Sequence, residues 1–293
     1  MKQIIYSAVL TALIGICASG QDRTLKVYIS ADMEGVAGVS TWAVQGLPPG
    51  REYEQFRHLL TKEVNAAIEG AYDAGATEVL VSDSHGDAQN IDVEQLDPRA
   101  RLIRSWPRPL QMMQGIDSTF DAVVFIGYHA GEGDADAVLA HTFSGKETVK
   151  LNGLTVPEAG FNAAIAGEFS VPVVFVSGDQ TIVAESKKMF GDIEAATVKN
   201  AIGFSSADML SPTEARRLIK LGVKRGIQRR KELTPFKVTH PVTMEISYKD
   251  MVMAEVASYL PGVERVNGNT IRFTGRDMVE ISKLHAALAT MRP

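Results

Sequence analysis

Nearly continuous apolar runs recur along most of the chain, and each ends in glycine or polar residues. The runs are KVYIS, EVLVS, AVVFIGY and VPVVFVS. Runs of this kind are typical of strands that are buried on both faces of a sheet. After the first run, apolar residues recur at helical spacing over about 53–74, and Gly75 ends the pattern. Strands that alternate with helices predict an α/β fold, with a mostly parallel sheet covered by helices on both faces.

The pattern changes at Ser211, where a long helix is expected. Ser211 suits the N-cap and Pro212 suits the first helical position. The remaining expected elements are a strand in VTMEISYKD, a helix over about 251–259, strands on both sides of a turn at Asn267 and Gly268, and a final helix from about Asp277. This order predicts a smaller C-terminal α+β lobe. We therefore expect a main domain over 21–210, and a helix with the smaller lobe over 211–293.

Residues 1–20 have the pattern of a secretory signal peptide. Lys2 gives a positive start, the run IIYSAVLTALIGICA is apolar, and CASG supplies small residues for cleavage near Gly20. The run is too short for a membrane span, so we expect none in the mature chain. Lipid attachment is not expected, because Ile16 stands before Cys17 where a small residue is required. We therefore expect an exported protein, periplasmic or extracellular.

Composition narrows the chemistry that the mature chain can perform. With 293 residues, of which 45% are hydrophobic, the chain can bury a large core. Cys17 is its only cysteine, so cleavage would remove disulfides, thiolate nucleophiles and cysteine metal ligands from consideration. The net charge is −5, and the densest basic group, 224–231, is interpreted as a solvated helix face. We therefore expect no nucleic-acid partner, and any metal must bind nitrogen and oxygen.

Three of the predicted strands end in side chains that bind metals. Asp32 and Glu34 follow the first strand, Asp83 and His85 the second, and His129 the third. In an open α/β sheet the ligand crevice lies beyond the carboxyl ends of the strands, so we expect these groups to converge. Each residue alone is more simply explained as a cap or a hydrogen-bonding group. Three successive strands with this ending favour a shared metal site.

Two further groups come later in the chain. Glu158 precedes a small-residue helical stretch, where a carboxylate would also stabilise the positive end of the helix. His141 follows an acid-dotted loop and could be an ordinary exposed histidine. The residues alone leave both alternatives open.

A series of short motifs contains these same residues: DMEG, DSH, GYHA, a later histidine, and PEAGFNAAIAG. In this order they resemble the zinc-dependent D-aminopeptidases associated with dipeptide transport. Later segments, SGD, TVKNAIGFSSADMLSP and DMVMAEVASYLPGVERV, are similar as well, so the resemblance covers nearly all of the mature chain. A single tetrapeptide would mean little, whereas the whole series in order is specific.

The resemblance implies two zinc ions per subunit, with manganese or cobalt as alternatives that the sequence leaves open. The implied ligands are Asp32 as the bridge, Glu34 and His85 in one site, and His129 and Glu158 in the other. His141 would be the catalytic residue outside the metal shell, and it would deliver a proton to the leaving amine. The range 21–210 would then be the metal-binding catalytic domain.

The implied activity is hydrolysis of the amino-terminal residue, preferentially a D-amino acid, from short peptides by a metal-activated hydroxide. The resemblance also implies ring-shaped homo-oligomers. Two other hypotheses remain: a metal-dependent amidase or esterase on another small substrate, and an exported peptide-binding protein without catalysis. Asp32, His85 and His129 are all present, which favours an enzyme.

Two residues near the expected ligands have alternative explanations. Asp83 either orients His85 from behind the metal site or caps the turn at the strand end, and we expect the first. Asn162 either contacts substrate or forms a helix hydrogen bond, and we expect the second.

Overall fold

The computed structural model describes residues 24–145 and 147–291. The expected signal peptide, with Cys17 and Gly20, lies outside the described residues. Within the described residues, no helix combines the length and the apolar character that a membrane crossing requires.

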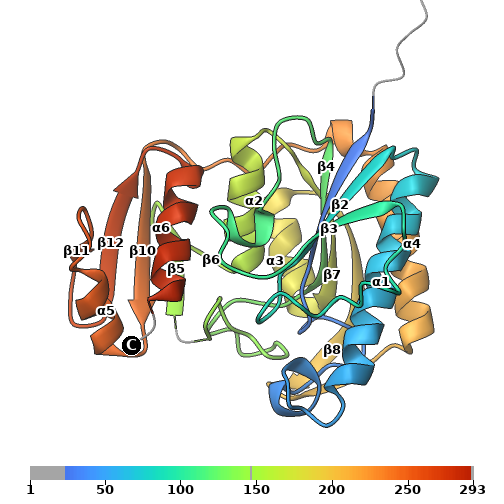
Figure 1. Cartoon of the computed structure of the whole chain (residues 1–293), viewed down its shortest axis with the longest axis horizontal. Helices are drawn as coiled ribbons and strands as arrows, with labels where there is room; N and C mark the ends of the chain where they lie inside the picture. The colour runs from blue at the N-terminus through green and yellow to red at the C-terminus, as the bar shows by residue number, and fades with distance from the viewer. Residues whose placement is uncertain (1–23, 146, 292–293) are drawn as a thin grey trace, which may run out of the picture.

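A seven-stranded sheet forms the body of the molecule (Figure 1). Its strands span Lys26–Ala31 (β1), Glu78–Asp83 (β2), Ala100–Ile103 (β3), Ala122–Tyr128 (β4), Val173–Asp179 (β7), Glu194–Gly203 (β8) and Ser206–Met209 (β9). Their order in the sheet is β3-β2-β1-β4-β7-β8-β9. Neighbouring strands pair in parallel except β8 and β9, which are antiparallel. The apolar runs correspond to β1, β2, β4 and β7, as predicted.

Helices cover both faces of this sheet. They span Tyr53–Asp73 (α1), Glu158–Glu168 (α2), Gln180–Phe190 (α3) and Pro212–Gln228 (α4). Side chains alternate along β1, so that Val27 and Ile29 pack with α1 and α4, whereas Tyr28 packs in the core with α2 and α3. The predicted Ser211 cap accepts a hydrogen bond from the Glu214 amide at the start of α4. The predicted α/β class is confirmed.

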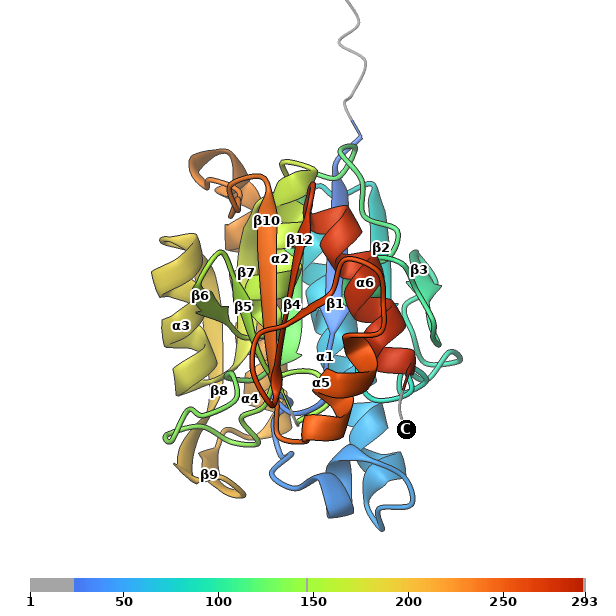
Figure 2. The same cartoon turned by 90° about the vertical axis from the view of Figure 1, so that its left-hand side faces the viewer.

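A smaller antiparallel sheet lies beside the body in Figure 1 and faces the viewer in Figure 2. Its strands span Glu147–Leu151 (β5), Leu154–Val156 (β6), Val242–Tyr248 (β10), Glu264–Arg265 (β11) and Thr270–Gly275 (β12). They follow the order β11-β12-β10-β5-β6. The other helices are Met251–Ala257 (α5) and Met278–Thr290 (α6), with short helical turns at Trp42–Gly46, Gln111–Met113 and Arg230–Glu232. The predicted turn at Asn267 and Gly268 joins β11 to β12, and Asp277 caps α6.

The division between the two sheets does not coincide with the predicted boundary after residue 210. β5 and β6 fall within the predicted main domain, yet β5 pairs with β10 in the smaller sheet. α4 falls beyond the boundary, yet Ile219 and Val223 share a core with Leu60 and Val64 of α1. Both differences arise because strand pairing and helix packing join segments that are far apart in the sequence.

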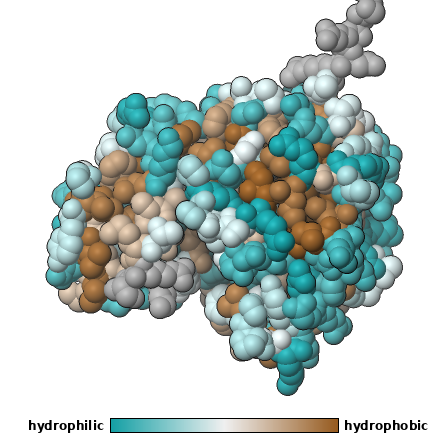
Figure 3. All heavy atoms as spheres, in the orientation of Figure 1, coloured by the Kyte–Doolittle hydropathy of each residue, from teal (hydrophilic) through white to brown (hydrophobic). Residues whose placement is uncertain are grey.

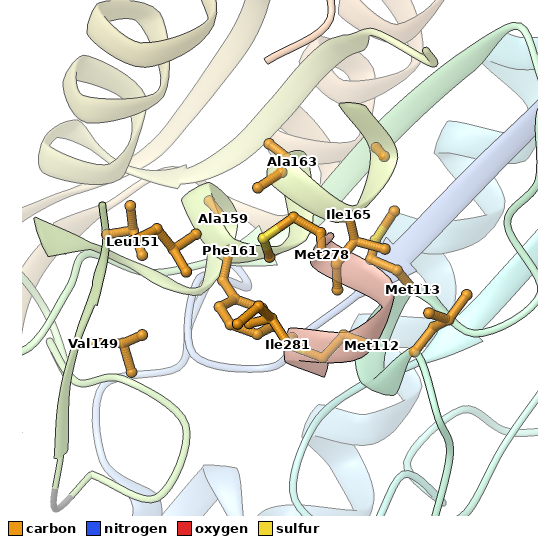
Figure 4. Close-up of a cluster of buried hydrophobic side chains, with 14 of the residues drawn as sticks. Met112, Met113, Val149, Leu151, Ala159, Phe161, Ala163, Ile165, Met278 and Ile281 are labelled. Atoms are coloured by element: carbon orange, nitrogen blue, oxygen red, sulfur yellow. The ribbon is translucent and has the colours of Figure 1, made fainter. Parts of the chain in front are cut away.

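A shared hydrophobic core joins the smaller sheet to the body. Its members include Met112, Met113, Val149 and Leu151 of β5, Ala159 and Phe161 of α2, and Met278 and Ile281 of α6 (Figure 4). α2 lies between the two sheets (Figure 1). Because apolar area removed from water contributes roughly 25 cal/mol per Å² to stability, this core holds the lobe in place. The smaller lobe can therefore form one fixed wall of a site.

Candidate metal centre

The strand order brings the predicted ligands together. β1 lies between β2 and β4, and Ala31 at its end is level with Asp83 on one side and Ile126 on the other. The residues just beyond these strand ends, all buried, are Asp32, Glu34, His85 and His129. Glu158 is the first residue of α2, and His141 lies in the loop between β4 and β5. The predicted convergence at the carboxyl edge of the sheet is present in the structure.

Two glycines allow the end of β1 and the end of β4 to approach closely. A Cβ on Gly35 would lie 2.1 Å from the Tyr128 carbonyl oxygen, and a Cβ on Gly127 would lie 2.2 Å from the Asp32 carbonyl oxygen. Gly127 also has a φ of +69°, which side chains of L-residues rarely adopt. The Gly35 amide donates to the Gly127 carbonyl at 2.7 Å. The loop that carries Asp32 is therefore fixed against the end of β4.

Asp32, Glu34 and His85 form the first group of candidate ligands. The His85 Nδ1 lies 2.9 Å from Glu34 Oε2 and 3.2 Å from Asp32 Oδ1. The His85 Nε2 faces the Gly46 carbonyl oxygen at 2.7 Å, and because a carbonyl only accepts, this nitrogen carries the proton. In a neutral ring the Nδ1 therefore presents a lone pair to two carboxylates, and in a protonated ring it donates to them. This arrangement requires positive charge between them.

His129, Glu158 and His141 form the second group. The His129 Nδ1 donates to the Ala130 carbonyl at 3.0 Å, so its Nε2 presents a lone pair. That Nε2 lies 3.3 Å from Asp32 Oδ2 and 3.4 Å from Glu158 Oε1, without a hydrogen-bond partner among the described residues. Asp32 Oδ2 also lacks a partner within this part of the chain. Buried polar atoms are normally hydrogen-bonded, so these facing acceptors mark a place for a positive ion.

The charges in the two groups depend on one another. Burial raises the pKa of Asp32, and the Glu34 carboxylate raises it further. Burial also acts to raise the pKa of Glu34, but the imidazoles of His85 and His141 hold it well below its ordinary value. The pKa of His85 is lowered by burial and raised more by Glu34 and Asp32, so that it lies well above its ordinary value. The carboxylates thus stabilise positive charge at this position, whether a proton or a metal ion.

The donor set fits zinc. Within each group the ligand atoms lie within 4.8 Å of one another. Three carboxylates and three imidazoles supply only nitrogen and oxygen, a set that zinc accepts. Asp32 faces both groups, because its Oδ1 is near His85 and its Oδ2 is near His129. One carboxylate therefore links the two groups.

His141 is placed to act either as a ligand or in proton transfer. Its Nδ1 donates to the Leu139 carbonyl at 2.8 Å, and its Nε2 lies 3.7 Å from Glu158 Oε1 and 3.9 Å from Glu34 Oε1. Its ring stacks on the His129 ring, with centroids 3.9 Å apart and an interplanar angle of 14°. His141 is only 8% exposed, so the alternative of an ordinary exposed histidine is wrong.

Asp83 shapes the loop that carries His85 and is not among the hydrogen-bond partners of the His85 ring. Its carboxylate accepts hydrogen bonds from Asn90 Nδ2 at 2.9 Å and from the Ile91 amide at 2.7 Å. The Gly46 carbonyl orients the ring instead. The expected role of Asp83 behind the metal site is therefore not found, because β2 ends at Asp83 and the same-side spacing of a strand does not continue to His85. The turn-capping alternative is the one that the structure contains.

Asn162 lies in the core and outside the site. It is fully buried, and its Nδ2 donates to the Tyr128 hydroxyl at 2.9 Å and lies 3.0 Å from the Met112 sulfur. These partners differ from both sequence-based alternatives, a substrate contact and a helix hydrogen bond. The side chain connects α2 to β4 because it points from the helix toward the sheet.

Two tryptophans lie near the site and were not predicted from the sequence. Trp42 Nε1 donates to Glu34 Oε1 at 2.6 Å, and its ring meets the His141 ring edge-on with centroids 5.1 Å apart. Trp106 Nε1 donates to the Gly86 carbonyl at 2.8 Å. They are the only tryptophans in the chain, and both stand outside the apolar runs. A large amphipathic ring in an expected loop is the signal that could have identified them.

A cavity of about 950 Å³ opens onto both groups. One wall contains the site residues Asp32, Glu34, His85, His141 and Glu158. The opposite wall comes from the smaller lobe, with Tyr248 of β10, Met253 of α5, and His285 and Ala286 of α6. The surface of the molecule is hollowed between the lobe and the body (Figure 3). The cavity has the size of a small-molecule or short-peptide site.

Known proteins are similar to this chain in sequence and in fold. A family model described as D-aminopeptidase matches residues 25–287. The D-aminopeptidase of Bacillus subtilis (strain 168) is 35% identical over 260 residues, which cover 87% of this chain and 93% of that protein. The structure of the Zn-dependent D-aminopeptidase DppA from Bacillus subtilis, a self-compartmentalizing protease, matches with a TM-score of 0.88 and 32% identity. The match covers 92% of this chain and 99% of the other.

Proposed function

The chain belongs to the D-aminopeptidase family, and we propose that it is a dinuclear zinc aminopeptidase that removes an amino-terminal D-residue from short peptides. The observation that supports this most is the position of Asp32. Its two oxygens lie 3.2 Å from His85 Nδ1 and 3.3 Å from His129 Nε2. A carboxylate between two imidazole lone pairs is suited to bridging two metal ions.

The proposed ligands, besides the shared Asp32, are Glu34 with His85 and His129 with Glu158. Zinc, when bound, lowers the pKa of water and polarises a carbonyl group. The chain itself fixes the carboxylates: Trp42 donates to Glu34 at 2.6 Å, and the Phe143 amide donates to Glu158 Oε1 at 2.6 Å. These hydrogen bonds therefore fix the orientation of the Glu34 and Glu158 carboxylates.

His141 is the proposed proton carrier. Its Nδ1 is held by the Leu139 carbonyl, so Nε2 is the atom that exchanges a proton. In this role Nε2 takes a proton from water and passes it to the leaving amine. Glu34 Oε1 and Glu158 Oε1 lie 3.9 Å and 3.7 Å from this nitrogen, on the side that faces the candidate ligands.

The substrate is proposed to bind in the cavity between the body and the smaller lobe, whose volume of about 950 Å³ suits a short peptide. The preference for a D-residue is proposed from the family. Assembly into a homo-oligomer is proposed because a relative is a self-compartmentalizing protease. Export is proposed from the signal-like residues 1–20.

The direct test compares purified protein on paired dipeptides that differ only in a D- or L-residue at the amino terminus. We expect faster hydrolysis of the D-form, loss of hydrolysis on chelation, and recovery when zinc is returned. Equal rates on both forms would contradict the D-preference. Cleavage of amides or esters alone would support the amidase hypothesis, and no cleavage of any substrate would support a binding protein.

A further inference from the structure

Lys199 lies directly behind the loop that carries Asp32 and Glu34. It belongs to β8, is 1% exposed, and is the only lysine that is buried among the described residues. Its Nζ donates hydrogen bonds to the main-chain carbonyls of Glu34, of Val36 at 3.0 Å and of Val39 at 2.6 Å. All three N–H groups of the ammonium therefore have main-chain partners.

The loop after β1 depends on these hydrogen bonds. Glu34, Val36 and Val39 are buried, so their carbonyls lie away from water. A buried carbonyl that loses its partner destabilises the fold. The Val36 carbonyl also accepts from the Val39 amide at 3.1 Å, whereas Lys199 is the partner of the carbonyls of Glu34 and Val39. By drawing three carbonyls to one point, Lys199 sets the curvature of the loop. The backbone of Glu34, and with it the direction of its carboxylate, is fixed from behind.

Lys199 also places a positive charge among buried carboxylates. Burial lowers its pKa to about 8, against the opposite effect of Asp179, Glu63 and Glu34. Glu63 of α1 holds the same loop from another side, where its Oε1 accepts from the Ala37 amide at 3.0 Å. The loop that supplies Glu34 is thus held by one buried cation and one buried carboxyl group.

Asp179 extends this support to the second loop of the site. At the end of β7, its Oδ2 accepts from the Val138 amide at 2.7 Å, three residues before His141. Its charge is among those that act on Lys199. Lys199 therefore holds the loop that carries Glu34, and Asp179 holds the loop that carries His141.

We propose that Lys199 is a positioning residue of the metal centre, which fixes the backbone of Glu34 so that its carboxylate meets His85. This inference rests on the proposed function, since it assumes that Glu34 and His85 hold zinc. A role in proton transfer does not fit, because the three donors of the ammonium are taken by carbonyls. Lys199 is also absent from the residues that line the cavity.

The test replaces Lys199 by methionine, an unbranched side chain that is one atom shorter and lacks the charge and the donors. Zinc is titrated into chelated protein in competition with a chromophoric chelator. Residues that support metal ligands from behind typically change metal affinity about 10- to 100-fold. We expect Lys199→Met to weaken one zinc site by about this factor and to leave the other near the wild-type value.

Single-site backgrounds identify the weakened site. His129→Ala leaves the Glu34–His85 site, and His85→Ala leaves the His129–Glu158 site. Adding Lys199→Met should weaken the zinc that remains in the first background and have little effect in the second. Equal weakening in both, or none in either, would overturn the inference.

Thermal unfolding separates positioning from a merely structural role. Zinc that binds the folded chain raises Tm by an amount that depends on its affinity. A structural role would lower Tm equally with and without zinc, whereas positioning reduces the rise that zinc produces. If the methionine variant does not fold, Lys199→Gln replaces it in these measurements, because its amide group removes the charge but keeps hydrogen-bond donors.

Glu63→Gln is the matched control. It changes a buried group on the same loop but keeps an oxygen that accepts from the Ala37 amide. We expect its zinc affinity to stay near the wild-type value, and a loss equal to that of Lys199→Met would contradict a specific role for Lys199. A wild-type chain that binds fewer than two zinc ions would instead contradict the proposed function, while the His129→Ala comparison would still test Lys199.

Discussion

At the end of β1, Asp32 turns one carboxylate oxygen toward His85 and the other toward His129. Each imidazole donates its other N–H to a main-chain carbonyl, so the nitrogen that faces the carboxylate has a free lone pair when the ring is neutral. Acceptors that face one another in a buried site need a cation. The proposed metal ions would therefore explain why two carboxylates follow the end of an apolar strand.

Also at the residue scale, a substitution of His141 tests whether this residue transfers protons or binds zinc. We expect His141→Ala to lower kcat about 10²- to 10⁴-fold, because proton transfer by a positioned side chain contributes a factor of this size. Both zinc ions should remain bound. The measurements are steady-state kinetics on a D-dipeptide and metal analysis of the same sample.

Loss of one zinc together with activity would make His141 a ligand. The geometry allows this outcome, because His141, His129 and Glu158 have ligand atoms within 4.8 Å of one another. A His141→Asn variant provides a comparison, since it keeps a polar side chain near Glu158 but cannot titrate.

The sequence identified the groups that converge here, because the carboxyl ends of parallel strands share an edge of the sheet. It did not identify what holds those groups in place. Gly46 contacts His85 through its main-chain carbonyl, and any residue type supplies such a carbonyl. Lys199 reaches Glu34 across 165 positions of sequence. Contacts of this kind carry no local pattern, so residue types and spacing could not predict them.

At the scale of elements, the loop after β1 must lie against the end of β4. Gly35→Ala should disturb this contact, because its new Cβ would lie 2.1 Å from the Tyr128 carbonyl oxygen, which belongs to the backbone and cannot move aside cheaply. We expect a loss of stability on the order of 3 kcal/mol, at the upper end for overpacked sites, and weaker zinc binding. Chemical denaturation and zinc titration measure the two effects.

Gly203→Ala is the matched control at the β8–β9 hairpin. A Cβ at Gly203 meets nothing within 4 Å. Its stability should stay within about 0.5 kcal/mol of the wild type, as for surface substitutions in general. A stable Gly35→Ala variant with normal zinc affinity would show that the approach of β1 to β4 does not position the ligands.

The individual elements were largely predictable. Apolar runs gave β1, β2, β4 and β7, and the Ser211 cap with Pro212 gave the start of α4. The way in which these elements pack together was less predictable. β5 has an alternating pattern of buried and half-buried residues. Its partner β10 is distant in the sequence: Ile246 pairs with Val149, 97 positions earlier. Pairing over such a separation is decided by packing in the whole molecule.

At the scale of the whole molecule, the smaller lobe forms one wall of the cavity that faces the candidate metal centre. Ala286 of α6 lines this cavity. We expect Ala286→Trp to fill part of it and to lower kcat/KM for dipeptides by about 10-fold or more, since small displacements of a substrate can cost up to about 100-fold. Zinc affinity should not change, because the proposed ligands belong to the body.

Ala287→Trp is the control for Ala286→Trp. Ala287 is exposed and is not among the residues that line the cavity. The same side chain is thus added one position away on the same helix, outside the site. Equal kinetics in the two variants would contradict a binding role for the lobe.

The most direct test of the central claim is a zinc titration of chelated protein, in which bound zinc per chain and hydrolysis of a D-amino-terminal dipeptide are measured on the same samples. The proposed dinuclear site predicts that two zinc ions bind per chain and that full activity requires both, with Asp32→Ala losing both ions. Full activity at one zinc per chain, or two bound zinc ions without hydrolysis, would contradict it.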